Sequence, residues 1–415
     1  MHIGDVLKYF GDFAPPREVK PRELTPHAPP GKAAVVTGPR RAGKTYLLHR
    51  QMSATGGFYI DFEHPLFADF APRDVDVVLE AYFKLSPNGP RYAYLDEVQA
   101  VEGWEKAVRY LLDRGFHVYA TGSTSRLMTG DVAREMRGRG LTYVLLPLSF
   151  REFLWFKGLK AEERDLWTPA RHEAARLQEE YLKWGGFPEV ALFEDKYRIL
   201  KEYLVTVVAR DVEERHGVRN KAALDAVVKY VLENYARHFT YNSLYRLLKT
   251  RGVTKRTVMN YVKYLEEAYF LFQVKRLAPS PREAEAAPRK IYLVDTGYAL
   301  FGRKDPGLDL ENAVYLHLLR VKHYRQPDAE IYYAAGKDWE IDFVVVKEGA
   351  PAAAVQAAAE LHYDNWEREV EAAAKAAKRL GLRKITVVTL HQEDHAKHNS
   401  VEVEVVPYWR WALTT

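Results

Sequence analysis

The chain has 415 residues, of which 47% are hydrophobic and 28% charged, and its formal net charge is +5. This length exceeds one ordinary domain, and the balance of residue types is that of a soluble globular protein. Cysteine is absent, which excludes disulfides, thiolate zinc sites and a cysteine nucleophile. Because no apolar run is long enough to span a bilayer, we expect a cytoplasmic protein with no membrane partner. The mild basic excess is compatible with nucleic acid, and the many charges are those that a hot cytoplasm (a thermophile) favours.

The first part of the chain has the pattern of an α/β fold. Residues 28–150 alternate short apolar runs with helical patterns, which is typical of βαβ units on a parallel sheet. We expect strands at residues 33–38, 57–63, 91–97, 116–123 and 141–149. Residues 1–27 precede this pattern and are interpreted as an N-terminal extension.

A phosphate-binding motif follows the first predicted strand. The stretch GPRRAGKT fits the Walker A pattern G-x-x-x-x-G-K-[ST] in full and lies between a strand and a helix. Its glycines allow backbone amides to turn onto phosphates, Lys44 would reach the β- and γ-phosphates, and Thr45 would bind Mg²⁺. The predicted ATP-binding residues are Gly38, Pro39, Arg40, Arg41, Ala42, Gly43, Lys44 and Thr45.

Acidic and hydroxyl side chains end two later strands of the same sheet. YAYLDE places Asp96 and Glu97 at the carboxyl edge, where ligands of such sheets bind. Asp96 would hold Mg²⁺ through water, and Glu97 would be the base that orients the attacking water. Thr121 or Ser123 would face the γ-phosphate, although capping of a turn explains these hydroxyls equally well. Together the motifs predict Mg²⁺-dependent ATP hydrolysis.

The middle of the chain turns helical and then changes again. Residues 239–277 have the pattern helix, turn, helix, strand, which is typical of a winged helix. Packing against a lid is the alternative to DNA binding by this region. Residues 278–290, rich in Pro and Ala, are interpreted as a linker, and residues 291–415 as a second, smaller α/β domain. The side chains that would contact DNA phosphates are Lys255, Arg256, Asn260 and Lys263.

Five segments carry a resemblance to a known family: GPRRAGKT, YLDEVQAVEGWEKAVRYLLDRG, ATGSTSRLM, GRGLTYVLLPLSFREFL and WGGFPEV. In these segments and their order, the chain resembles archaeal and bacterial AAA+-type ATPases (ASCE P-loop ATPases) over nearly its whole length. The resemblance implies a P-loop ATPase core, a helical lid, a winged helix and a C-terminal domain similar to a degenerate PD-(D/E)XK restriction endonuclease. These parts would occupy residues 28–150, 151–205, 206–277 and 291–415.

The resemblance also implies two further nucleotide contacts. Arg139 stands where the family has a Gly-Arg pair, a candidate catalytic contact with the γ-phosphate of the same subunit or of a neighbour in a homo-oligomer. A surface arginine is the alternative. GGFPE at residues 185–189 resembles the lid element with which related ATPases sense nucleotide, so Pro188 would pack near the base; a turn between helices is the alternative.

The C-terminal domain retains part of a nuclease site. Restriction-type nucleases bind Mg²⁺ with acids and activate water with a lysine. Glu311 and Asp342 match two acids, whereas Gln356 and Ala358 stand where an acid and the lysine belong. With one carboxylate fewer and no cation left, we expect the domain to be inactive, unless an acid such as Glu360 has moved into the site.

The sequence therefore predicts an AAA+-type ATPase whose hydrolysis is coupled to nucleic acid or to a partner protein through the winged helix and the C-terminal domain. Two alternatives stay open. One is a nucleotide-controlled protein-interaction switch with slow turnover, and the other is an ATP-linked nuclease.

Overall fold

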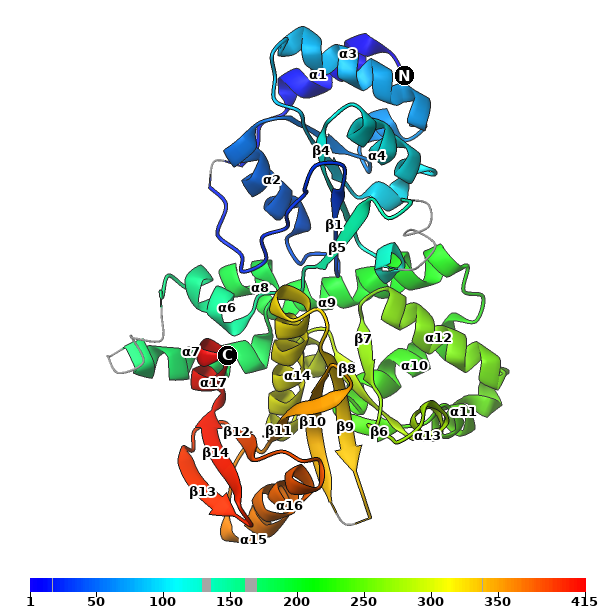
Figure 1. Cartoon of the computed structure of the whole chain (residues 1–415). Helices are drawn as coiled ribbons and strands as arrows, with labels where there is room; N and C mark the ends of the chain where they lie inside the picture. The colour runs from blue at the N-terminus through cyan, green and yellow to red at the C-terminus, as the bar shows by residue number, and fades with distance from the viewer. Residues whose placement is uncertain (17, 129–135, 161–169, 338) are drawn as a thin grey trace. The chain divides into compact units, whose positions relative to one another are not determined.

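The computed structural model of the chain describes residues 1–16, 18–128, 136–160, 170–337 and 339–415. The chain divides into two compact units, Met1–Leu146 and Pro147–Thr415 (Figure 1). Within the described residues, the search for a helix both long and apolar enough to cross a membrane finds none.

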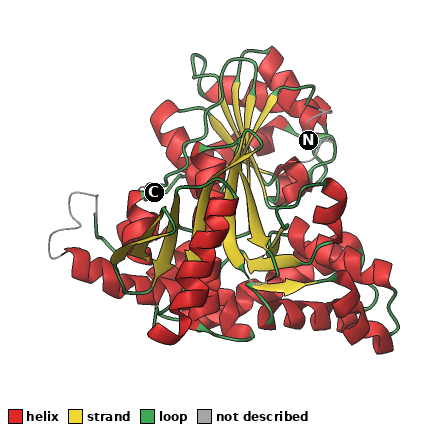
Figure 2. Cartoon of the chain, turned by 60° about the horizontal axis from the view of Figure 1, so that its bottom comes forward, coloured by secondary structure: helices red, strands yellow, loops and turns green. Residues whose placement is uncertain are grey.

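The first unit is built on a parallel sheet with the strand order β2-β3-β4-β1-β5. The strands are β1 (Ala33–Thr37), β2 (Phe58–Asp61), β3 (Tyr92–Asp96), β4 (His117–Gly122) and β5 (Gly140–Val144). Figure 2 shows these strands side by side with helices on both faces. Because every pair is parallel, the carboxyl ends of all five strands meet at one edge. The expected parallel α/β sheet is confirmed.

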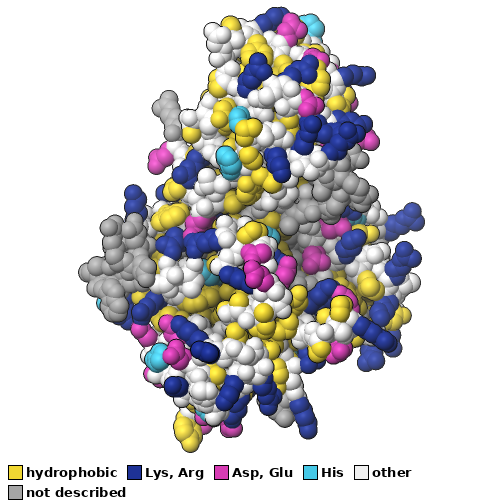
Figure 3. Space-filling model, in the orientation of Figure 1, with side chains coloured by type: hydrophobic (Ala, Val, Ile, Leu, Met, Phe, Trp, Pro, Cys, Tyr) yellow, Lys and Arg dark blue, Asp and Glu magenta, His cyan; other side chains and the backbone are white. Residues whose placement is uncertain are grey.

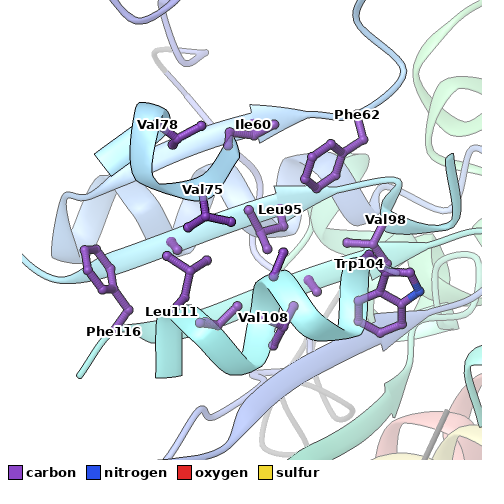
Figure 4. Close-up of a cluster of buried hydrophobic side chains, with 14 of the residues drawn as sticks. Ile60, Phe62, Val75, Val78, Leu95, Val98, Trp104, Val108, Leu111 and Phe116 are labelled. Carbon is purple, nitrogen blue, oxygen red and sulfur yellow. The ribbon is translucent and has the colours of Figure 1, made fainter. Parts of the chain in front are cut away.

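One face of this sheet is covered by α3 (Val75–Leu85) and α4 (Trp104–Asp113). Apolar residues three and four apart on α4 point toward the sheet, as expected for an amphipathic helix. Figure 4 shows Val108 and Leu111 of α4 against Ile60 and Leu95 of the strands. All four residues are at most 2% exposed. This layer therefore fixes β2 and β3, whose carboxyl ends lie at the same edge of the sheet as the phosphate motif.

The N-terminal residues, which were interpreted as an extension over residues 1–27, belong to the compact first unit. Helix α1 (Ile3–Asp12) packs against α3 and buries Val6 completely. The backbone N–H of Asp61 donates to the Tyr9 hydroxyl at 3.0 Å. The amphipathic pattern of α1 in the sequence was the available signal for this packing.

The second unit begins with helices. They are α6 (Phe150–Phe156), α7 (Ala170–Trp184), α8 (Pro188–Leu192), α9 (Lys196–Thr206), a π-helical turn (Val207–Glu214) and α10 (Lys221–Glu233). Helices α11 (Tyr241–Leu248) and α12 (Lys255–Glu267) follow. Helix α12 buries Val258, Val262 and Leu265, whereas Leu247 of α11 is 60% exposed.

A three-stranded antiparallel sheet accompanies α11 and α12. Its strands β6 (Arg237–Phe239), β7 (Leu271–Val274) and β8 (Arg289–Leu293) have the order β6-β8-β7. Residues 278–290, which were interpreted as a linker, contain α13 (Pro281–Ala286) and the start of β8. The apolar run of β8 has the pattern of the first strand of a new domain. However, β8 pairs with β6 and β7, which precede it in the chain.

A six-stranded mixed sheet completes the second unit, with the order β13-β14-β12-β11-β10-β9. Its strands are β9 (Glu330–Ala335), β10 (Glu340–Lys347), β11 (Ala350–Ala357), β12 (Lys384–Thr389), β13 (Asp394–His398) and β14 (Val401–Pro407). Helices α14 (Pro306–Arg325), α15 (Tyr363–Trp366), α16 (Ala372–Arg379) and α17 (Tyr408–Thr414) accompany it. The expected second α/β sheet is thus observed.

Candidate nucleotide-binding site

The phosphate motif forms a tight loop between β1 and α2 (Lys44–Thr55). Gly38 and Gly43 have φ of 150° and 94°, and Arg41 also has a positive φ of 65°. A Cβ on Gly38 would lie 2.0 Å from the carbonyl oxygen of Leu145, so only glycine fits there. The loop directs the amino end of α2, with its backbone N–H groups, to the carboxyl edge of the sheet.

Lys44 is the first residue of α2, and its side chain is 3% exposed. Its ammonium donates to the carbonyl oxygens of Gly38 and Pro39 at 3.1 and 3.0 Å, and lies 3.9 Å from Oε1 of Glu97. The neighbouring Arg40 pairs with Glu63 at 3.2 Å. The structure therefore brings the predicted lysine and the predicted base together.

Asp96, at the end of β3, is 2% exposed and accepts hydrogen bonds from three hydroxyls. Thr45 donates at 2.7 Å, Tyr59 at 2.8 Å, and Thr121 at a shorter distance. Carboxylate and hydroxyl oxygens are ligands that Mg²⁺ prefers, so Thr45 and Asp96 fit such an ion. Tyr59 was not predicted from the sequence; burial, with Asp96 close by, raises the pKa of its hydroxyl far above the usual value.

Glu97 follows Asp96 with a positive φ of 50°, and its side chain is 15% exposed. The Gln99 amide donates to the Glu97 carboxylate and, at 3.3 Å, to the Ser123 hydroxyl. Burial raises the pKa of Glu97, but the nearby Lys44 ammonium and the Gln99 hydrogen bond outweigh burial and lower the pKa below its usual value. Glu97 is thus held as a carboxylate at neutral pH. Sequence reasoning assigned no role to Gln99, although it lies in one of the segments that carry the family resemblance.

Two hydroxyls were predicted at the end of β4. Thr121 donates to Asp96 and accepts from the backbone N–H of Glu97 at 3.2 Å, so it supports the acid pair. Ser123 is fully buried and contacts Gln99. Both lie at the same edge as the phosphate loop, because β4 pairs with β1. The part of each in sensing the γ-phosphate stays a prediction.

Two family models match separate parts of the chain. Residues 30–154 match a family model described as an AAA domain, and residues 175–304 match a domain of unknown function, DUF8612. The uncharacterised protein MJ1544 of Methanocaldococcus jannaschii is 32% identical over 93% of this chain and 89% of its own length. This chain belongs to the MJ1544 family. An uncharacterised protein of Haemophilus influenzae is 28% identical over 75% of the chain and 81% of its own length.

The AAA-domain match of this MJ1544-family chain supports nucleotide binding and hydrolysis in general terms. Among solved structures, a Walker-type ATPase of Pyrococcus abyssi has a TM-score of 0.42 and 14% identity, covering 72% of this chain and 93% of its own. Cdc6p of Pyrobaculum aerophilum has a TM-score of 0.25 and 13% identity, covering 71% and 90%. No functional inference depends on these distant similarities.

Arg139 does not join the nucleotide site of this MJ1544-family chain. It immediately precedes β5, and its carbonyl oxygen accepts from the N–H of Ala33, the first residue of β1. Parallel strands begin at one edge and end at the other, so Arg139 lies at the amino edge, opposite the phosphate loop. Its guanidinium pairs with Asp113 at the end of α4. The predicted contact of Arg139 with a γ-phosphate, of the same subunit or of a neighbour, stays a prediction.

Pro188 begins α8 in the second unit, after the predicted turn of two glycines. The backbone N–H of Gly186 donates to the buried Asp295 carboxylate at 2.7 Å, and burial raises the pKa of Asp295 to about 6. The glycine turn is thus fixed by a residue that follows β8. The predicted contact between Pro188 and the nucleotide stays a prediction.

The predicted nuclease residues meet around a lysine that sequence reasoning did not select. The Lys290 ammonium lies 3.0 Å from Glu311, 2.8 Å from Asp342 and 2.7 Å from Glu340. The expectation that no cation remains is therefore wrong. Lys290 comes from β8, in a different sheet from Asp342, so no linear motif could reveal it.

The contacts of Gln356, which stands where a nuclease site would have an acid, also differ from the expectation. Gln356 accepts from the N–H of Asp342 at 3.1 Å and donates to Glu369 at 3.0 Å. The acid that contacts Gln356 is Glu369, and Asp364 and Glu367 also line the cavity at this site. Glu360 pairs with His362 at the surface.

Proposed function

We propose that the first unit binds Mg-ATP in the loop of residues 38–45 and hydrolyses it. This proposal depends on the convergence of three side chains: Lys44, just after β1, and Asp96 and Glu97, at the end of β3. The Lys44 ammonium lies 3.9 Å from Glu97. The arrangement of an amide-lined loop, a lysine, a buried Asp with a hydroxyl beside it and an ionised Glu is the set that phosphoryl transfer to water requires.

Each side chain has a distinct part in this reaction. Lys44 exchanges the carbonyls of Gly38 and Pro39 for phosphate oxygens, and Glu97 accepts the proton of the attacking water. Gln99 orients the Glu97 carboxylate and links it to Ser123. Thr45 and Asp96 would hold Mg²⁺, which neutralises phosphate charge when bound.

Replacing Lys44 tests the binding half of the proposal. Lys44→Ala should weaken the binding of ATP with Mg²⁺ by about 10- to 100-fold, because charge-assisted hydrogen bonds to phosphate are lost. Calorimetric titration measures this change. Lys32→Ala removes an exposed lysine just before β1 and should leave the affinity unchanged. Equal affinities of the two variants would refute the assignment.

We further propose that α10, α11 and α12 with β6, β7 and β8 form a winged helix that contacts DNA phosphates. Three helices with a small antiparallel sheet support this proposal. Lys255, Arg256 and Lys263 are exposed, Asn260 is half-buried, and Lys263 lies 3.7 Å from Glu267. In the space-filling view, Lys and Arg side chains gather on the outer side of this segment (Figure 3).

The double variant Lys255→Ala/Arg256→Ala should weaken binding to duplex DNA uniformly across sequences. It should also reduce the slope of log affinity against log salt by about 2, since two phosphate contacts are lost. Fluorescence anisotropy at several salt concentrations measures both. Lys229→Ala on α10, where the lysine is 74% exposed, is the matched control. Binding with an unchanged salt slope would remove α12 from the interface.

A second candidate is a nucleotide-controlled switch read by a partner protein. Exposed apolar side chains around α8 and α9 favour it: Leu192, Phe193 and Tyr197 are 47%, 55% and 51% exposed. The ATPase rate with and without DNA separates the two candidates. Strong stimulation by DNA supports coupling to nucleic acid, whereas a slow rate indifferent to DNA supports the switch.

A further inference from the structure

The second unit contains a cavity of about 1270 Å³. It is lined by residues of β6, β8, α14, β10, β11 and α16, including Lys290, Glu311, Asp342 and Gln356. In a restriction-type nuclease, acids at these positions would hold a divalent metal ion. Whether the residues present fit such an ion depends on Lys290.

Lys290 occupies the point at which the carboxylates converge. Its side chain is 3% exposed, and its ammonium lies within 3.0 Å of oxygens of Glu311, Glu340 and Asp342. The ammonium donates hydrogen bonds to Glu311 and Asp342 and forms an ion pair with Glu340. Burial lowers the pKa of Lys290, but the three acids outweigh this and raise it well above the usual value, so the cation persists.

Two of these acids have further hydrogen-bond partners. Glu311 Oε1 accepts from the Tyr292 hydroxyl at 2.7 Å as well as from Lys290, and Asp342 Oδ2 accepts from the N–H of Ala357 at 2.9 Å. Gln356 supplies a neutral amide where a third charge would help bind a metal. Over the described part of the chain, no group of three or more His, Asp or Glu residues is arranged to hold a metal ion.

We propose that Lys290 is a built-in substitute for a divalent cation, so that this cavity binds no metal ion and cannot activate water through one. The ammonium neutralises the acids as an ion would, but its protons point at carboxylates and are not available to a phosphate. The inference concerns the second unit alone and does not depend on ATP hydrolysis.

The proposal predicts a gain of metal binding when the ammonium is removed. Lys290→Met should bind one additional Mn²⁺, counted by electron paramagnetic resonance of free Mn²⁺ in the full chain without nucleotide. Lys290→Met/Asp342→Asn should lose that ion again, and Lys290→Arg, which keeps the charge, should not gain it. The wild-type count should not change with Asp342→Asn.

If Lys290→Met folds poorly without metal, the melting temperature with and without Mn²⁺ still tests the proposal. Mn²⁺ should then raise the melting temperature of Lys290→Met and not that of Lys290→Met/Asp342→Asn, because an ion that binds only the folded state stabilises it. Two results overturn the proposal. One is a wild-type chain that binds a Mn²⁺ which Asp342→Asn removes, and the other is a Lys290→Met variant with neither added binding nor added stability in Mn²⁺.

Discussion

Glu97→Gln should leave the affinity for Mg-ATP nearly unchanged and lower the rate of ATP hydrolysis by about 10²- to 10⁴-fold, the usual contribution of a general base. Glutamine has nearly the same shape but cannot accept a proton. The change also removes the negative partner 3.9 Å from Lys44, so binding of the phosphate anion should not weaken. Phosphate release measured under saturating ATP gives the rate, and calorimetric titration gives the affinity.

Glu102→Gln is the matched control for this variant. Glu102 is an exposed acid five residues later in the same loop region, and its replacement should not change the rate. Hydrolysis at the wild-type rate in Glu97→Gln would show that another group takes the proton. Glu97 would then be a structural partner of Lys44 only.

Gly185→Ala should destabilise the second unit by about 3 kcal/mol, through a positive φ and overpacking together. Gly185 has a φ of +81°, and a Cβ built on it would lie 1.6 Å from Oδ1 of Asp295. Asp295 is buried and receives the N–H groups of Gly186 and Gly297, so it has little freedom to move away. Urea denaturation of wild type and variant measures the loss.

Gly381→Ala separates the two causes. Gly381 lies in the same unit with a nearly equal φ of +77°, but a Cβ there meets nothing within 4 Å. This variant should lose only about 1 kcal/mol, the cost of the left-handed backbone conformation alone. If both variants lost the same stability, the contact with Asp295 would contribute nothing.

The nucleotide site was predictable because its chemistry is local in sequence. The phosphate loop is one continuous stretch, and each of Asp96, Thr121 and Ser123 ends or follows a strand whose carboxyl end must meet that loop. The residues that orient these groups were not predictable. Tyr59 belongs to no motif, and Gln99 lies in a quoted segment but had no assigned role. The contacts of both depend on side-chain directions that strand pairing alone does not specify.

The differences between the expected and observed positions of residues have a common physical cause. Sequence order alone says little about which sheet a residue belongs to, or at which edge of the sheet it lies. Arg139 precedes β5 and therefore lies at the amino edge, although it stands close to the motifs in sequence. Lys290 enters the acid cluster from β8, a strand that pairs with β6 and β7 and not with β10. A migrated charge of this kind is visible only in three dimensions.

The position of β8 also determines how the protein can be dissected. Because this strand is the middle member of the sheet β6-β8-β7, a fragment ending near residue 277 would keep two strands that have no partner. A fragment beginning near residue 291 would lack Lys290, leaving the acids of the C-terminal sheet without their counter-charge. Either half would therefore have an incomplete core, and these features stay together only in a fragment that contains β6, β8 and the C-terminal sheet, as the compact second unit Pro147–Thr415 does.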